Sequence, residues 1–247
     1  MTEVEPHVPH ARALADFHAG ERDAQIRLRS SLGEDDEIPA GIFFRPPEEF
    51  FPFETYAIEL CRGRVADLGA GTGVHALVLQ DRGVDVTAVE RLDEGVRIMR
   101  ERGVRRIVHG DMFEPGLGTF DTVIMLMNGI GPVGTLAGLD RFLGEAGRLL
   151  EPGGQLLVDS GEAHPAADAD TGSWPPPTAD RYPGEAWIRL AYGELEGAPF
   201  RELYADAGTL ARRARRAGWR CSIVHEERGG YLARLMRQPP TPQAGST

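Results

Sequence analysis

The sequence predicts an α/β protein with a doubly wound, mostly parallel seven-stranded sheet and helices on both faces. To this it adds an N-terminal helical cover and a β-hairpin inserted before the last helix. Two observations lead to this fold. From Arg64 onward, short β-branched runs alternate with helix-length stretches, and a glycine-rich turn joins the first run to the first helix. A repeated strand, helix, strand order gives parallel neighbours with helices on both faces.

The predicted elements follow from local patterns of apolar residues and turn residues. Seven runs are predicted as strands: residues 65–68, 84–90, 105–109, 120–127, 155–160, 219–226 and 231–237. Helices are predicted over residues 73–82, 94–102, 139–150 and 209–217. Residues 186–195 and 200–204 alternate in polarity and are predicted to form the inserted antiparallel hairpin.

The chain divides by composition into three parts. These are an N-terminal tail with a helical and aromatic cover, a cofactor-binding domain that contains a lid and the hairpin, and a disordered tail. Their predicted bounds are residues 1–63, 64–237 (lid and hairpin at 161–207) and 238–247.

The cover itself has three predicted sections. Residues 1–10 contain two prolines and are expected to be a loose tail, and residues 11–32 a helix or a pair of short helices. Residues 39–56 are dense in aromatic side chains and interrupted by proline, so they are not expected to form a regular helix.

Composition excludes several classes of enzyme. The chain has 247 residues and a formal net charge of −11 (27 basic minus 38 acidic residues), and none of its basic residues is a lysine. Schiff-base enzymes, pyridoxal-phosphate enzymes, protein kinases and P-loop NTPases all need a lysine amine. The acidic balance argues against nucleic acid and membrane as partners.

The cysteine and hydropathy patterns bear on metal binding, secretion and membrane insertion. Cys61 and Cys221 are far apart in the chain and lack a metal-ligand spacing, so no metal is expected. No secretory signal or apolar run of membrane-spanning length is present, and a cytoplasmic monomer or homodimer is expected.

The strongest motif is the stretch Asp67–Leu–Gly–Ala–Gly–Thr–Gly73 at the end of a predicted buried strand. Glycines allow positive φ and a close approach of a ligand to the backbone, and the N-terminus of a helix offers free N–H groups. An adenosine-bearing ligand is therefore expected over the first strand. A dinucleotide site needs the spacing GxGxxG, but the third glycine comes one residue early here and an acid, Asp67, precedes the loop. Both departures favour S-adenosylmethionine over NAD.

Over residues 64–160, five motifs in order resemble those of the class I (Rossmann-like) S-adenosylmethionine-dependent methyltransferases. Besides the glycine loop, they are Val86–Glu90, His109–Met112, Phe120–Ile124 and Leu150–Gly154. The resemblance implies S-adenosylmethionine as cofactor and S-adenosylhomocysteine as product. The residues expected around the cofactor are Arg45, Asp67, Gly69, Ala70, Gly71, Gly73, Glu90, Arg91, Asp111, Met112, Met127 and Asn128.

The resemblance gives each part of the cofactor its residues. Asp67, Gly69 and Gly71 would surround its amino-acid end, Glu90 would hold both ribose hydroxyls, and Asp111 would accept from the adenine amino group. A carboxylate at a strand end can accept two hydrogen bonds from a diol, which supports Glu90 on physical grounds. Glu90 as a surface ion-pair partner and Asp111 as a turn cap stay open as alternatives. Arg45 is expected to pair with the cofactor carboxylate or to lie on the surface.

The methyl acceptor is expected beyond the carboxyl ends of the fourth and fifth strands. Asn128 there departs from the Asn/Asp-Pro-Pro-aromatic motif of enzymes that methylate DNA bases, and it either orients a ligand or caps the turn. Asp159, Glu162 and His164 are candidates for a base, each weighed against an ordinary loop role. Trp187, Tyr192 and Tyr204 are expected to line the acceptor pocket or the core of the hairpin.

The predicted function is methyl transfer to an oxygen or nitrogen atom of a small molecule, with a role in bacterial secondary metabolism. An NAD-linked oxidoreductase and a non-catalytic cofactor-binding module stay open as alternatives.

Overall fold

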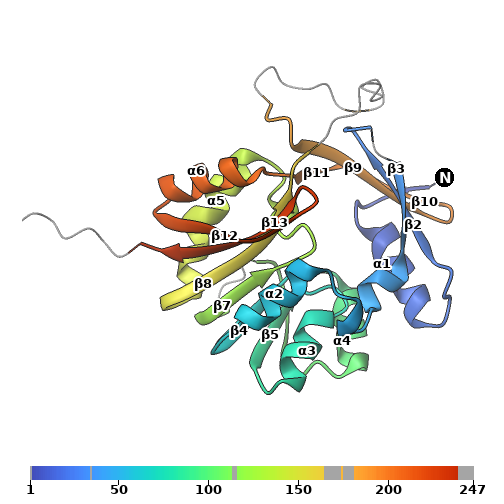
Figure 1. Cartoon of the computed structure of the whole chain (residues 1–247). Coiled ribbons are helices and arrows are strands. Elements are labelled where there is room, and N and C mark those ends of the chain that lie inside the picture. Colours follow the sequence, from blue (N-terminus) through green and yellow to red (C-terminus); the bar gives the residue numbers. More distant parts are fainter. Residues whose placement is uncertain (1, 34, 113–115, 164–173, 175–180, 239–247) are drawn as a thin grey trace, which may run out of the picture.

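The computed structural model of the chain contains two β-sheets and six α-helices within the residues it describes, which are 2–33, 35–112, 116–163, 174 and 181–238. The larger sheet has seven strands in the order β12-β13-β8-β7-β4-β5-β6, and the smaller has six. In Figure 1 the smaller sheet stands to the right of the larger one, with α1 beside it.

The seven-stranded sheet confirms the predicted α/β class. Its strands are β4 (Arg64–Leu68), β5 (Asp85–Glu90), β6 (Ile107–His109), β7 (Phe120–Met125), β8 (Leu150–Gly161), β12 (Trp219–Glu227) and β13 (Gly230–Arg237). The five strands from β8 to β6 run parallel, whereas β13 is antiparallel to both β8 and β12. Because β4 lies between β5 and β7, the carboxyl ends of these three strands share one edge of the sheet.

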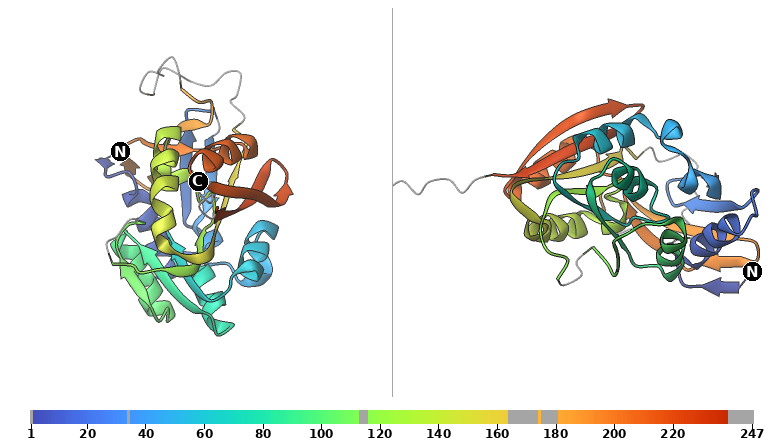
Figure 2. Two further views of the ribbon diagram at one scale, coloured as in Figure 1. Left: turned by 90° about the vertical axis from the view of Figure 1, so that its left-hand side faces the viewer. Right: turned by 90° about the horizontal axis from the view of Figure 1, so that it is seen from below.

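Helices cover both faces of this sheet. They are α2 (Pro52–Leu60), α3 (Val74–Asp81), α4 (Asp93–Arg102), α5 (Leu136–Ala146) and α6 (Ala207–Arg216). The first three lie on one face and the last two on the other (Figures 1 and 2). Four short 3₁₀ turns, Ala40–Phe44, Pro47–Glu49, Gly131–Val133 and Gly147–Leu149, lie in the connections.

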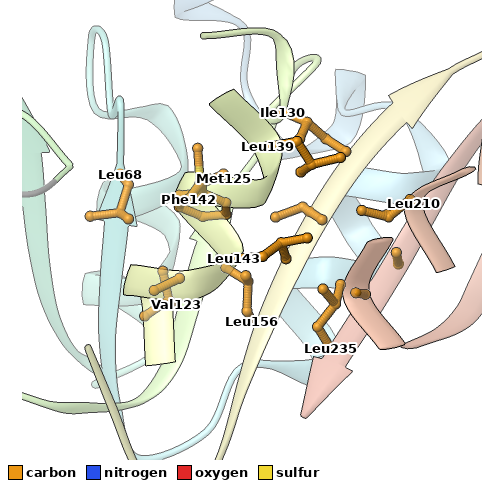
Figure 3. Packing of buried hydrophobic residues seen from close by; sticks show 14 of the residues in the cluster. Leu68, Val123, Met125, Ile130, Leu139, Phe142, Leu143, Leu156, Leu210 and Leu235 are labelled. Atoms are coloured by element: carbon orange, nitrogen blue, oxygen red, sulfur yellow. The ribbon is translucent and has the colours of Figure 1, made fainter. Parts of the chain in front are cut away.

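The core is built by the apolar stripes of these helices. On the α5 side, Leu139, Phe142 and Leu143 lie at the helical spacing of one face and are at most 1% exposed (Figure 3). They pack against Val123 and Leu156 of the sheet, and Leu210 of α6 joins the same cluster. A second cluster fills the α2 and α3 side of the sheet. Burial of apolar area on both faces, worth about 25 cal/mol per Å², holds the strand ends in place.

The smaller sheet joins the N-terminal segment to the inserted hairpin. Its strands are β1 (Thr2–Val4), β2 (Gln25–Ser30), β3 (Asp35–Pro39), β9 (Glu185–Tyr192), β10 (Leu195–Gly197) and β11 (Phe200–Leu203). One edge of β9 pairs with β2, and the other pairs with β11 along its first half and with β10 near its end. The antiparallel pairing of β9 with β11 agrees with the predicted hairpin, while β10 is an additional strand.

Two expectations for the N-terminal segment are wrong. Residues 1–10 are not a loose tail, because β1 pairs with β10 and helix α1 (Val8–His18) begins within them. Residues 11–32 are not all helical, because Gln25–Ser30 forms a strand. The physical reason is a period of two: Ile26 and Ser30 are buried while Arg27 and Arg29 are exposed, and β9, far away in the chain, supplies the pairing.

The aromatic segment also departs from expectation. A regular helix, α2, begins at Pro52 inside it, since proline is well suited to the first turn of a helix, where its missing N–H costs nothing. Residues 161–183, the part of the predicted lid and hairpin region that precedes the hairpin, fall mostly outside the described residues, as does all but the first residue of the predicted tail at 238–247. Among the helices that are described, none combines the length and apolar character needed to cross a membrane.

Candidate functional site

The glycine loop connects β4 to α3 with three left-handed backbone positions. Gly69, Gly71 and Gly73 have φ of 74°, 56° and 80°. A Cβ added at Gly69 or Gly71 would meet no atom within 4 Å, so this backbone faces open space. A Cβ at Gly73 would come within 2.8 Å of Val104 and 2.9 Å of Met99. The first two glycines therefore leave the backbone accessible to a ligand, whereas Gly73 allows α3 to pack closely against its neighbours.

Asp67 lies at the end of β4, directly before this loop, and is 2% exposed. Its Oδ2 has no hydrogen-bond partner among the described residues. Burial raises the pKa of Asp67 to about 6, an effect that His75 opposes and Glu90 adds to. A buried carboxylate oxygen without a donor is costly, which makes Asp67 Oδ2 a natural acceptor for a ligand N–H group.

Glu90 ends the neighbouring strand β5 and holds the loop from the other side. Its Oε2 accepts from the backbone N–H of Gly71 at 2.9 Å, and its Oε1 accepts from that of Leu92 at 2.8 Å. Gly95 makes this position possible, since a Cβ there would come within 2.8 Å of Glu90 Cγ. Each carboxylate oxygen keeps a second lone pair, so Glu90 can still accept hydrogen bonds from a diol.

The three residues expected near an adenine lie at the ends of β5 and β6. Arg91 and Asp111 are exposed, and Met112 is partly buried against the α5-side cluster. The ring Nε2 of His109 lies 3.1 Å from the carbonyl oxygen of Arg91, and Gly110 N–H donates to the carbonyl of Glu90 at 3.0 Å. These contacts tie the two strand ends together and leave Arg91 and Asp111 at the surface beside them.

Arg45 lies inside the protein and not on its surface. Its side chain is 5% exposed and forms an ion pair with Glu54, which is fully buried. Its Nη2 also lies 3.1 Å from Met127 Sδ, and its Nε has no hydrogen-bond partner among the described residues. Arg45 therefore pairs with an internal carboxylate and still has one buried N–H to donate.

Glu54 is the centre of this buried network, and the sequence did not single it out. In addition to Arg45, it accepts from the backbone N–H of Phe51 at 2.8 Å and contacts His75 Nε2 at 2.6 Å. These donors lower the pKa of Glu54 although burial opposes them. His75 belongs to α3, so the network links the N-terminal cover to the helix that follows the glycine loop. The available signal was a glutamate three residues after Phe51 at the start of a helix, the N3 position from which a side chain reaches back to the N-cap N–H.

The segment after β7 is strained. Met127 and Asn128 both adopt left-handed backbone conformations, with φ of 68° and 56°, and we call this pair the Met127–Asn128 turn. Asp159 holds the turn, since its carboxylate accepts from the N–H groups of Asn128 at 2.8 Å and Gly129 at 3.0 Å. Burial raises the pKa of Asp159 to about 6, and these two hydrogen bonds oppose the rise.

Of the other expected bases, Glu162 is exposed at the end of β8, and His164 lies outside the described residues. Asp159 differs from Glu162, because each of its carboxylate oxygens is already bonded to the backbone of the turn. Within the described residues, no group of three or more His, Cys, Asp or Glu side chains is placed to hold a metal ion.

A second carboxylate, Glu202 of β11, lies beside the Met127–Asn128 turn and was missed by the sequence. Its Oε2 is 3.4 Å from Asn128 Nδ2 and 3.2 Å from the Tyr204 hydroxyl, which donate to it. Ser160 Oγ donates to the side-chain oxygen of Asn128 at 3.3 Å. The available signal was the alternation Phe200, Glu202, Tyr204 in the predicted strand 200–204, which sets an acid between two aromatic residues at a period of two, although the strand itself ends at Leu203.

The three aromatic residues expected to line the acceptor pocket do not lie together in the structure. Tyr204 contacts Glu202, as described, and Tyr192 packs against the core of the smaller sheet. Trp187 instead stacks with Arg201, whose guanidinium lies 4.9 Å from the ring centroid. Trp187 alternates with the buried Ala186 and Ile188, so it points to the opposite face of the sheet.

Comparison with known proteins places this arrangement among methyl-transferring enzymes. A family profile described as "Methyltransferase domain" matches residues 66–158. The crystal structure of an S-adenosylmethionine-dependent methyltransferase from Bacteroides fragilis, in complex with S-adenosylhomocysteine, is 32% identical in sequence with a TM-score of 0.82. That match covers 95% of this chain and 96% of the other.

Two further relatives match less of the chain or only its fold. The demethylmenaquinone methyltransferase of Tropheryma whipplei (strain Twist) is 31% identical over 100 residues, which is 38% of this chain and spans only 40% of the length of that relative. The CcbJ methyltransferase from Streptomyces caelestis is 18% identical with a TM-score of 0.57, over 78% of this chain and 99% of the other, and shows the fold alone.

Proposed function

Because this chain belongs to the class I S-adenosylmethionine-dependent methyltransferases, we propose that it methylates an oxygen or nitrogen atom of a small molecule in bacterial secondary metabolism. The cofactor supplies an electrophilic methyl group on a sulfonium, so the protein needs chiefly to bind and align the two reactants. None of this requires a lysine, in keeping with the lysine-free composition of the chain.

One observation carries the cofactor assignment: one buried side-chain atom in the N-terminal cover and one beside the glycine loop, of opposite hydrogen-bonding character, lack partners among the described residues. Asp67 Oδ2 is an acceptor without a donor, and Arg45 Nε is a donor without an acceptor, among the described residues. Glu54 pairs with Arg45 and contacts His75, and the charge of His75 acts on Asp67. The amino-acid end of S-adenosylmethionine has an ammonium group and a carboxylate, which would satisfy both groups at once.

The remaining contacts follow from the strand ends. We assign the backbone of Gly69, Ala70 and Gly71 to the same end of the cofactor, and Glu90 to the ribose hydroxyls. Arg91, Asp111 and Met112 would border the adenine. Because Gly73 is packed against Met99 and Val104, its part in this site is to set the start of α3.

The Met127–Asn128 turn forms the boundary between cofactor and acceptor. β7 is the direct neighbour of β4, so the turn lies one strand away from Asp67 and the glycine loop. Asp159 fixes the turn, and Asn128 presents its side-chain amide toward Glu202 and Ser160. We assign Asn128 to orientation of the reactants and Asp159 to positioning of Asn128.

Isothermal titration with S-adenosylhomocysteine and with NAD tests the cofactor assignment. We expect binding of S-adenosylhomocysteine, no binding of NAD, and a loss of affinity in Glu90→Gln on the order of 100-fold, since two hydrogen bonds to a charged group are worth about 3 kcal/mol or more. Asp85→Asn is the matched control, because Asp85 lies at the opposite end of β5 and pairs with Arg106 at the surface. Equal binding of both ligands, or unchanged affinity in Glu90→Gln, would overturn the assignment.

A further inference from the structure

Glu202 is partly buried, and its charge is balanced differently from that of most enclosed carboxylates in the described part of the chain; Asp67, proposed above to bind the cofactor, is another carboxylate there without an ion pair. Glu54 is paired with Arg45 and His75, and Glu185 is paired with Arg201 at 2.5 Å. Asp159 and Glu90 each accept two backbone N–H groups. Glu202 forms no ion pair with any arginine or histidine in the described part of the chain, and its pKa is raised, chiefly by burial.

The hydrogen bonds of Glu202 leave one side of the carboxylate available. Its two donors, Tyr204 Oη and Asn128 Nδ2, both reach Oε2, at 3.2 and 3.4 Å. No donor to Oε1 is found among the described residues. A carboxylate held by two neutral donors at these distances is only weakly compensated, because hydrogen bonds weaken as they lengthen.

The location of Glu202 ties it to the proposed reaction. β11 crosses the end of the larger sheet next to the Gly131–Val133 turn, and a Cβ added at Gly131 would come within 3.4 Å of Glu202. Asn128, its direct neighbour, is part of the strained turn after β7. Aromatic residues stand two positions before and after Glu202, at Phe200 in β11 and at Tyr204 directly after it.

We propose that Glu202 binds the methyl acceptor and that the acceptor is an amine, held as its ammonium ion between this carboxylate and the aromatic side chains of Phe200 and Tyr204. An ammonium ion supplies both the charge and the hydrogen-bond donors that Glu202 lacks, and aromatic faces attract cations. A neutral alcohol of the same shape would supply a single donor and no charge. This inference rests on the proposed function and narrows its acceptor atom from oxygen or nitrogen to nitrogen.

The same contact accounts for the protons of the reaction. The Glu202 carboxylate takes one proton from the ammonium, which frees the lone pair of the nitrogen. That lone pair forms the new nitrogen–carbon bond while the carbon–sulfur bond of the donor breaks and its electron pair stays on sulfur. The product is an N-methylammonium ion, and the proton on Glu202 returns to water.

The test compares amines with alcohols of identical skeleton on the protein loaded with S-adenosylhomocysteine. Benzylamine with benzyl alcohol, 2-phenylethylamine with 2-phenylethanol, and glucosamine with glucose are titrated by calorimetry against wild type, Glu202→Gln and Glu194→Gln. Glu194 is exposed in the turn after β9 of the same sheet, so its variant controls for loss of one negative charge. Circular dichroism melting confirms that each variant is folded.

For wild type and Glu194→Gln we expect at least one amine to bind tenfold or more tightly than its alcohol, and Glu202→Gln to abolish that preference with unchanged affinity for S-adenosylhomocysteine. A preference that persists in Glu202→Gln, or a panel in which no amine outbinds its alcohol, contradicts the inference while leaving the cofactor assignment intact. Failure of S-adenosylhomocysteine itself to bind contradicts the proposed function as well.

Methyl transfer from radiolabelled S-adenosylmethionine to the amine that binds best gives the second readout. Glu202→Gln should raise the KM for that amine and lower the kcat of the transfer.

Discussion

The backbone N–H of Asn128 donates to Oδ2 of Asp159 at 2.8 Å. This contact joins the ends of two neighbouring parallel strands, β7 and β8, and fixes a residue with φ of 56°. A left-handed residue other than glycine costs about 1 to 2 kcal/mol, and the Met127–Asn128 turn contains two of them. Asp159 offsets that strain, which gives it a positioning role that a free base would not have.

Removal of Asp159 is therefore expected to affect stability as well as activity. In Asp159→Ala the N–H groups of Asn128 and Gly129 lose their acceptors, and we expect the free energy of unfolding to fall by about 2 to 4 kcal/mol. Urea denaturation measures this, and methyl transfer should fall in parallel because the turn is no longer fixed. Glu162→Ala, an exposed neighbour, should match wild type in both measurements. Full stability of Asp159→Ala together with lost activity would show that Asp159 is a base instead.

Asp67 is expected to weaken the ligand-free protein at neutral pH. The pKa of Asp67 is raised from 3.8 to about 6, so the folded state binds more protons than the unfolded state between these values. Below about pH 4 Asp67 is protonated in both states and does not weaken the fold. As the pH rises through 6 the buried side chain ionises, and the free energy of unfolding falls. Asp67→Asn, which stays neutral, should be more stable than wild type at pH 8 by up to about 3 kcal/mol.

Denaturation of Asp67→Asn and wild type at pH 4.5 and pH 8, without ligand, measures this difference. The advantage of the variant should shrink toward pH 4.5, and its affinity for S-adenosylhomocysteine should be lower than that of wild type at both values. Such an exchange of stability for binding is common where a site contains a buried unpaired charge. An advantage independent of pH would rule out titration of Asp67 as its cause.

The parts of the fold that local sequence determines were predicted well. The glycine loop, the acid at the end of β5 and the apolar stripe of α5 each lie within a short stretch whose pattern has one dominant structural solution. The seven-stranded sheet follows from these units because strand, helix, strand connections allow few topologies.

The smaller sheet could not be predicted in the same way. β2 pairs with β9 from Arg27 opposite Ala191 to Ser30 opposite Ile188, so its partner lies more than 150 residues further along the chain. The short strand Gln25–Ser30 has a period of two that is readable afterwards but competes with a helical interpretation of the charged residues around it. Tertiary pairing decided between them.

The candidate site shows the same division. Asp67 and Glu90 could be proposed from the sequence because each lies in the last two residues of a strand next to the glycine loop. Glu54 and Glu202 were not, because their importance comes from what surrounds them in space: three donors in the first case and no cationic partner among the described residues in the second. Burial and pairing of a carboxylate are properties of the folded chain, and residue type alone does not reveal them.

Arg45 is expected to have both a structural and a binding role, and two variants separate them. Arg45→Met leaves Glu54 buried with one fewer cationic neighbour and should lower the free energy of unfolding by about 3 kcal/mol or more. Arg45→Met combined with Glu54→Gln removes both charges, and we expect it to regain a large part of that stability. If Arg45 Nε binds the cofactor carboxylate, calorimetry should still find weakened S-adenosylhomocysteine binding in the double variant. Affinity restored together with stability would assign Arg45 to folding alone.

His10 of α1 is expected to make the N-terminal cover sensitive to acid. Its ring lies edge-on to Phe43 with centroids 4.9 Å apart, and burial lowers its pKa from 6.5 to about 4. A lowered pKa means that the unfolded state binds the proton more readily, so stability present above pH 6.5 is lost as the pH falls toward 4. The loss reaches up to about 3 kcal/mol at the acid end of this range. We expect His10→Leu, which cannot be protonated, to show a shallower loss of stability than wild type between pH 7 and pH 4.5 in urea denaturation.

The pH slopes of the two proteins should coincide between pH 7.5 and pH 9, where His10 is neutral in both states, which provides the internal control. Parallel curves over the whole range would assign the acid sensitivity to other groups.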